Sequence, residues 1–278
     1  MNILELSGAV WAGSVFAGLL GSLTGLGGGV VLVPFLTLLF GVDIRYAIGA
    51  SLVSVIATSS GAATAYVREG YSNIRVGMFL EIATTIGATL GAYLVTQVST
   101  SAISIIFGLA LLASVYSTIS AHTDSIKDDQ ADPLAARLRL DGTEPAADGP
   151  KPYHVHSIPI GFLLMGVAGT LSGLLGIGSG AMKVLAMDRA MRLPFKVSAA
   201  TSNFMIGVTA AAGAGIYLGK GYIDPGLAMP VMLGVLPGSI IGARILTGAR
   251  VKSLRILFGL VILGLGIEMI ISGLGGRI

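Results

Sequence analysis

Six apolar segments, each long enough to cross the hydrocarbon core of a bilayer, constrain this chain more than any other feature. Crossing that core takes about 20 predominantly apolar residues. Such segments occur near 47–67, 74–97, 101–120, 197–218, 225–247 and 254–273. Because lipid offers the backbone no hydrogen-bond partner, each segment is expected to be a helix. The sequence therefore predicts an all-α polytopic protein embedded in a lipid bilayer.

The composition excludes several other classes of protein. Only 11% of the 278 residues are charged, whereas soluble domains carry about 25%. The absence of cysteine rules out disulfides and thiolate chemistry. The 17 basic residues form no long run, so no nucleic-acid partner is expected. The membrane segments hold neither an acid, base and nucleophile in close array nor a metal-ligand cluster, so we expect no enzyme, no cofactor and no metal.

The chain repeats itself at a constant offset of 151 residues. Fixed-period similarity across a whole half is the signature of a duplicated unit. We predict a first membrane repeat over 1–120, a hydrophilic linker over 121–156 and a second membrane repeat over 157–278. The matched pairs include Gly18 and Gly169, Gly25 and Gly176, Gly29 and Gly180, Ser51 and Ser202, Tyr66 and Tyr217, Gly87 and Gly238, and Gly91 and Gly242.

The linker is the one polar tract of the chain and is expected outside the bilayer. Asp132 and Pro133 predict the start of a short surface helix, as a cap and a first-turn proline. All three histidines, His122, His154 and His156, lie in this tract. Two interpretations stay open: a metal-binding or pH-sensing site, and a solvated junction at the membrane surface.

Two further apolar regions, 3–40 and 157–191, are each interrupted by glycines, as "GLGGG" at 25–29 and "GIGSG" at 176–180. The first region is too long for a single crossing at 1.5 Å per residue. Glycine accepts the positive φ angles that a turn requires, so we expect each region to be a broken, re-entrant helix hairpin. A packing seam of small residues, Gly21, Gly25 and Gly29, is the alternative.

Loop charges favour an inverted arrangement of the two repeats. If each broken region crosses once, the basic residues divide equally, eight against eight. If each re-enters, one side of the membrane has only Arg45, Lys220 and Arg277, and the other side has thirteen basic residues. This unequal division satisfies the positive-inside rule. We therefore predict inverted repeats, each a re-entrant hairpin plus three transmembrane helices, with both termini outside and the linker cytoplasmic.

Paired helix breaks at membrane depth predict an anion site. Irregular backbone is tolerated there only where it is buried or lines a cavity, and inverted-repeat transporters bind substrates at such breaks. Helix N-termini attract anions. Lys183 supplies a charge, although it could instead extend to an interface. The candidate substrate-binding residues are Gly25, Gly27, Gly28, Gly29, Ser51, Gly176, Gly178, Ser179, Gly180, Lys183, Ser202 and Asn203.

Two acidic residues lie in apolar segments. Glu81 is a candidate proton or gating site, and Glu268 is expected at an interface. Neither has an acidic counterpart at the 151-residue offset.

The stretches "GLLGSLTGLGGGVVLVPFLTLLFGVDIRYAIGASLVSV" and "GVAGTLSGLLGIGSGAMKVLAM" resemble the sulfite exporter TauE/SafE family, also called the toluene sulfonate uptake permease family. The resemblance covers nearly the whole chain. The chain departs from the pattern at Leu185, the position equivalent to Pro34, and at Lys183.

The resemblance implies transport, often outward, of small sulfur-containing anions such as sulfite, sulfoacetate and other organosulfonates across a prokaryotic plasma membrane. Alternatives are a permease for another anion or metabolite and a protein that anchors partners. Substrate identity, direction, coupling ion and oligomeric state, including a homo-oligomer, stay open.

Overall fold

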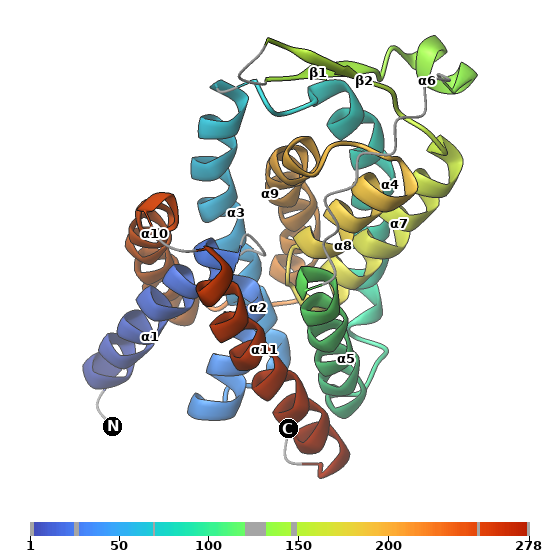
Figure 1. Cartoon of the computed structure of the whole chain (residues 1–278). Coiled ribbons are helices and arrows are strands. Elements are labelled where there is room, and N and C mark those ends of the chain that lie inside the picture. Colours follow the sequence, from blue (N-terminus) through green and yellow to red (C-terminus); the bar gives the residue numbers. More distant parts are fainter. Residues whose placement is uncertain are drawn as a thin grey trace.

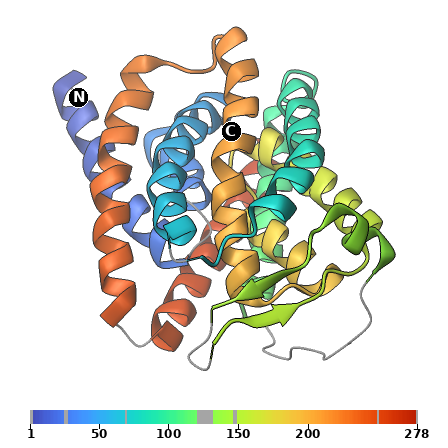
Figure 2. The same cartoon turned by 90° about the horizontal axis from the view of Figure 1, so that it is seen from above.

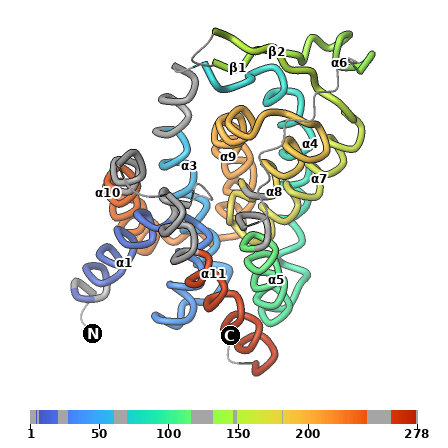
Figure 3. The backbone as a smooth tube through the Cα atoms, viewed as in Figure 1, coloured from blue at the N-terminus to red at the C-terminus, as the bar shows by residue number. Residues whose placement is uncertain are grey.

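The computed structural model describes residues 3–24, 28–68, 70–119, 132–145, 149–248 and 251–276 (Figures 1 and 3). The first half contains α1 (Ile3–Thr24), α2 (Gly29–Pro34), the π-helical segment η1 (Phe35–Leu39), α3 (Ile44–Arg68), α4 (Ile74–Leu94) and α5 (Thr100–Ile119). The second contains α7 (Ile158–Leu175), α8 (Gly180–Leu185), η2 (Ala186–Ala190), α9 (Phe195–Gly219), α10 (Pro225–Gly248) and α11 (Val251–Leu274).

The two halves contain the same elements in the same order. α2 and α8, η1 and η2, and α3 and α9 begin and end at positions that differ by the offset found in the sequence. The left-handed residues that end segments also correspond, since Gly41 matches Arg192 and Gly70 matches Gly221. The duplication is therefore present in the secondary structure as well as in the sequence.

All six segments predicted as membrane helices are helical. Among the described residues, three helices are long and apolar enough to cross a membrane: α4, α7 and α9. α4 and α9 are predicted crossings, whereas α7 belongs to the second glycine-interrupted region. The helices thus support the predicted all-α membrane protein.

The second glycine-rich break has the backbone that the sequence predicts. Gly176 has a φ of 66° and Gly178 a φ of 69°, and Ser179 also adopts the left-handed conformation, with a φ of 43°. Such angles disfavour a side chain with a Cβ. A helical turn cannot continue through these residues, so α7 ends at Leu175 and α8 begins at Gly180.

The two arms of each broken region are unequal. α1 has 22 residues and α7 has 18. Each return arm joins a six-residue α-helix to a five-residue π-helical segment, and 11 residues span about 16 Å, roughly half of the hydrocarbon core. The second break is confirmed, most of the first lies at residues 25–27, outside the described residues, and the re-entrant path through a membrane stays a prediction.

The π-helical segments occur in both halves, although only the first half has a proline there. Pro34 ends α2 and Leu185 ends α8 at the equivalent position. Because η2 forms without a proline, the widened turn is a property of the duplicated fold and does not come from the proline ring.

The halves are interlocked through close contacts at glycines. α1 packs along α10, and the equivalent α7 packs along α4 (Figures 1 and 2). A Cβ on Gly87 in α4 would overlap the carbonyl oxygen of Gly166, and one on Gly238 in α10 would overlap that of Val15. The two contacts are equivalent, because each residue of one contact matches a residue of the other at the 151-residue offset. The repeats are thus related to each other in packing, and their inversion across a membrane stays a prediction.

Replacing Gly87 by alanine should therefore destabilise the protein. The new methyl group meets backbone of α7, which cannot move without separating the helices. Overpacking of this kind costs about 1–3 kcal/mol, or a drop in melting temperature of about 5 °C for a chain of this size. Thermal unfolding in detergent measures it. Gly215→Ala is the matched control, because a Cβ there meets nothing within 4 Å, and equal melting of both variants would refute the close approach.

The linker is folded where the structure describes it. α6 (Pro133–Leu138) has Asp132 as its cap, accepting a hydrogen bond from the Leu134 amide at 2.9 Å, as predicted. The strands β1 (Gly142–Glu144) and β2 (Lys151–Tyr153) form an antiparallel hairpin that the sequence did not predict. This unit lies at the ends of α3 and α4 (Figure 1). In the part of the chain that the structure describes, both membrane repeats are thus all-α and one small hairpin lies between them.

Asn73, the cap of α4, connects this hairpin to the helices. Its Nδ2 donates to the Leu140 carbonyl and to the Tyr153 hydroxyl, both at 2.8 Å. Burial raises the pKa of Tyr153, and the nearby Asp141 and Glu144 carboxylates add to that rise, while the Asn73 bond opposes it. Leu140 is buried against the helices. The described part of the linker is therefore packed on the protein.

The histidines of the linker are only partly described. His154 Nδ1 lies 3.2 Å from Asp141 Oδ2, and the His156 amide donates to the Met191 carbonyl. His122 lies outside the described residues. Among the residues that the structure describes, no group of three metal-ligating side chains comes together. The geometry of this tract thus gives the two remaining histidines structural contacts.

Candidate functional site

The two glycine-rich breaks meet inside the protein. Gly28 and Gly29, at the start of α2, are buried. A Cβ on Gly29 would lie 2.7 Å from the Gly176 carbonyl oxygen and 2.5 Å from Ser51 Oγ. Ser51 Oγ in turn donates to that carbonyl at 2.8 Å. Residues from opposite halves of the chain therefore form one buried junction, and α3 contributes the serine that joins them.

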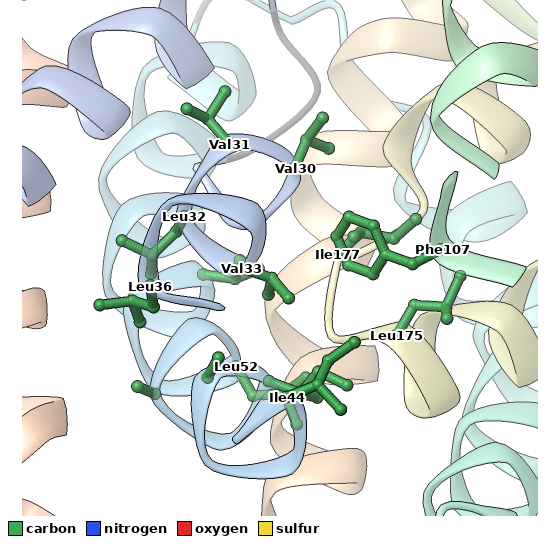
Figure 4. Close-up of a cluster of buried hydrophobic side chains, with 14 of the residues drawn as sticks. Val30, Val31, Leu32, Val33, Leu36, Ile44, Leu52, Phe107, Leu175 and Ile177 are labelled. Atoms are coloured by element: carbon green, nitrogen blue, oxygen red, sulfur yellow. The ribbon is translucent and has the colours of Figure 1, made fainter. Parts of the chain in front are cut away.

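Apolar side chains surround this junction. Figure 4 shows Val30 and Val33 of α2 on the side that faces Ile177, in the second break, and Phe107 of α5. All four side chains are buried in the same cluster. Water has little access to polar atoms in such a setting, so each hydrogen bond or charge there matters more than at a surface.

Serine hydroxyls hold the backbone of the second break. Ser179 Oγ donates to the Ala168 carbonyl in α7 at 2.7 Å. Ser202 Oγ, in α9, donates to the Gly180 carbonyl at 3.2 Å. Since the Ser179 side chain is used in this way, it does not cap α8, and Gly28 has no side chain to cap α2. The first turns of both return arms thus lack a side-chain cap.

Lys183 lies on α8 and is completely buried. Its Nζ donates to Thr209 Oγ1 at 2.5 Å, and Thr209 Oγ1 lies 2.6 Å from Glu81 Oε1. Thr209 is also fully buried, and Glu81 is 7% exposed. The alternative in which Lys183 extends to an interface is therefore wrong. The lysine instead belongs to a chain of polar groups, Lys183–Thr209–Glu81, that links α8, α9 and α4.

The structure brings most of the predicted residues into two connected groups. Gly29, Ser51 and Gly176 form the junction, with Gly28 next to it in the chain, and Ser179, Gly180 and Ser202 form the entry to α8, directly after Gly178. Asn203 is not part of either group, since its Nδ2 donates to Ala199 of its own helix. Gly25 and Gly27 lie outside the described residues.

Thr209 is the residue that the sequence analysis missed. A single threonine in an apolar helix carries no signal of its own, because threonine commonly bonds to its own helix. Thr209 matches Thr58 at the offset of 151, and that match could have drawn attention to it. Its link to Glu81, 128 residues away, appears only in three dimensions.

Comparison with known families decides the class of the protein. The sequence model of the sulfite exporter TauE/SafE family matches residues 10–269. The chain belongs to the TauE/SafE family. This match extends from α1 to α11 and so includes both breaks and the linker.

Curated relatives in this family are named as transporters. The chain is 29% identical over 269 residues to the probable membrane transporter protein YunE of Bacillus subtilis, covering 94% of this chain and 96% of that protein. It is 29% identical over 273 residues to the probable membrane transporter protein MJ0441 of Methanocaldococcus jannaschii, covering 91% of each. No solved structure matches the chain. This TauE/SafE protein is a membrane transporter.

Proposed function

We propose that this transporter carries small sulfur-containing anions, such as sulfite, sulfoacetate or other organosulfonates, and that it acts mainly as an exporter. The observation that carries the proposal is Lys183, a fully buried cation on the return arm of a helix break. A buried charge requires a partner of opposite sign. Glu81 reaches Lys183 only through Thr209, so an anionic substrate can act as the direct partner, and the family name points to sulfite.

The junction of the breaks provides the remaining contacts in this proposal. Uncapped amides of α2 and α8 donate to substrate oxygens, and the glycines leave room for a close approach of the backbone. Lys183 contributes charge, and Ser51 and Ser202 orient oxygens by exchanging their present carbonyl partners for the substrate. Asn203 is the least supported of the predicted substrate-binding residues, because its amide donates to a carbonyl of its own helix.

Alternating access follows from the duplicated architecture. The helices form two packed groups, one of α1, α3 and α10 and one of α4, α7 and α9, which meet along α3 and α9, so rocking of one group against the other exposes the junction first to one side and then to the other. The site itself stays near the middle of the membrane in both states. This motion requires the predicted inversion of the repeats.

Flux into proteoliposomes tests the proposal. Purified protein is reconstituted, and uptake of labelled sulfite, sulfoacetate, taurine and sulfate is compared with protein-free liposomes. Saturable movement of sulfite or a sulfonate is the expected result. Absence of movement for all four, with folded and inserted protein, would contradict the proposed substrate class and favour another anion, a metabolite or an anchoring role.

A further inference from the structure

The hydroxyl of Thr209 can form a hydrogen bond with Glu81 whether Glu81 is ionised or protonated. A hydroxyl has one proton to donate and two lone pairs to accept with. Thr209 Oγ1 accepts from Lys183 Nζ and has two acceptors within reach, Glu81 Oε1 at 2.6 Å and the Met205 carbonyl at 3.0 Å. When Glu81 is ionised, the hydroxyl donates to its carboxylate. When Glu81 carries a proton on Oε1, Glu81 donates to Thr209, and the hydroxyl turns to Met205.

One oxygen of the buried Glu81 carboxylate lacks a hydrogen-bond donor. Its Oε1 also accepts from Thr85 Oγ1 at 3.3 Å, whereas its Oε2 is buried and has no hydrogen-bond partner. A buried carboxylate oxygen without a donor is unfavourable, and a proton on Oε1 removes the charge, so that Oε2 becomes a neutral carbonyl oxygen whose burial costs less. The ionised form of Glu81 is thus stabilised mainly by the positive charge of Lys183, which is connected to it by hydrogen bonds through Thr209.

Few other charges can influence Glu81. α7, which packs along α4, contains no charged residue, and α9 contains only Lys196, more than three turns before Thr209. On α4 itself, Arg75 is exposed and donates to the Arg139 carbonyl of the linker. The charges nearest to Lys183 along the chain, Asp188 and Arg189, follow α8 in η2. Asp141, in the linker that covers the start of α4, bonds to His154.

We infer that Glu81 is a proton-binding site coupled to the anion, an inference that rests on the proposed function. In the empty transporter, Glu81 acts as the counterion of Lys183. The substrate anion takes over this role when it binds, and the displaced carboxylate takes up one proton from water. The Lys183–Thr209–Glu81 chain thereby gains one positive charge, which offsets one negative charge of the bound anion, and anion and proton move together.

This coupling gives the direction of transport an energetic basis. An inward proton gradient opposes outward movement of the anion, so export by this transporter requires an outward anion gradient that exceeds the proton gradient. Since the protonated form binds the anion, raising the pH weakens binding, by up to about tenfold per pH unit where one proton is taken up.

Proton movement in proteoliposomes tests the inference. Vesicles that enclose a pH-sensitive dye receive an inward gradient of sulfoacetate, which does not itself titrate near neutral pH. The wild-type protein should acidify the vesicle interior. Glu81→Gln should exchange labelled sulfoacetate but give no acidification, and its binding should be independent of pH. Glu268→Gln is the matched control, because Glu268 is an exposed acid on α11 and should behave as the wild type.

Each outcome separates the inference from the proposed function. No sulfoacetate exchange by the wild type would contradict sulfoacetate as a substrate. Exchange without acidification would overturn the proton coupling alone, even if Glu81→Gln fails to fold. Coupling lost in Glu268→Gln and retained in Glu81→Gln would also overturn it.

Discussion

Replacing Lys183 by methionine should lower the saturable flux of sulfite about 10- to 100-fold, because a hydrogen bond to a charged group contributes about 1.5–3 kcal/mol and 1.4 kcal/mol is a factor of ten. Methionine has a similar length and fills the same buried space without a charge. Without the lysine, Glu81 carries a proton and donates to Thr209, so no unpaired charge is left buried in this variant. The loss should therefore concern substrate binding and leave the fold intact.

Flux per inserted protein measures the effect, together with thermal unfolding of the variant. Lys220→Met is the matched control, since Lys220 is exposed and lies over the ring of Tyr93. It should transport as the wild type does. Undiminished flux in a folded Lys183→Met protein would remove this lysine from the site.

The helices were predictable because each carries its own signal. A membrane helix can be predicted from the length and hydrophobicity of one segment, and all six predicted segments are helical. The cap at Asp132 and the turn at Gly176 and Gly178 are equally local. Local interactions between neighbouring residues determine these features, so the sequence pattern is sufficient to locate them.

The polar chain from Lys183 to Glu81 was only half predictable. Each end could be found, because an ionisable residue in an apolar segment is unusual. Their connection could not, since Thr209 belongs to a different helix from either of them. The contact depends on how α4, α8 and α9 pack, which the sequence of one segment does not specify.

The short hairpin was missed for a similar reason. Its strands have three residues each, too few for an alternating pattern to appear. Their pairing is supported by contacts with Asn73, about 70 residues earlier in the chain.

The repeat glycines were predictable only in part. Their offset predicted the duplication, and only the structure explains Gly87 and Gly238 as contacts between halves.

Replacing Gly29 by alanine should destabilise the protein and reduce transport, although alanine favours a helix by about 1 kcal/mol over glycine. The new Cβ would lie 2.5 Å from Ser51 Oγ and 2.7 Å from the Gly176 carbonyl. The serine cannot rotate away without losing its bond to that carbonyl. We expect a cost of about 1–3 kcal/mol from overpacking. Gly8→Ala, where a Cβ meets nothing within 4 Å, should not show it.

A double-mutant cycle distinguishes this junction from a general packing defect. Ser51→Ala removes the nearer of the two obstructing atoms and leaves the Gly176 carbonyl in place, so Gly29→Ala should cost less in that background. The relief should appear in melting temperature and in sulfite flux together, because both depend on the junction. Additive effects of the two substitutions would mean that Gly29 and Ser51 do not interact. Since Ser51 also donates to the Gly176 carbonyl, relief in the Ser51→Ala background would place Gly29, Ser51 and Gly176 at one junction.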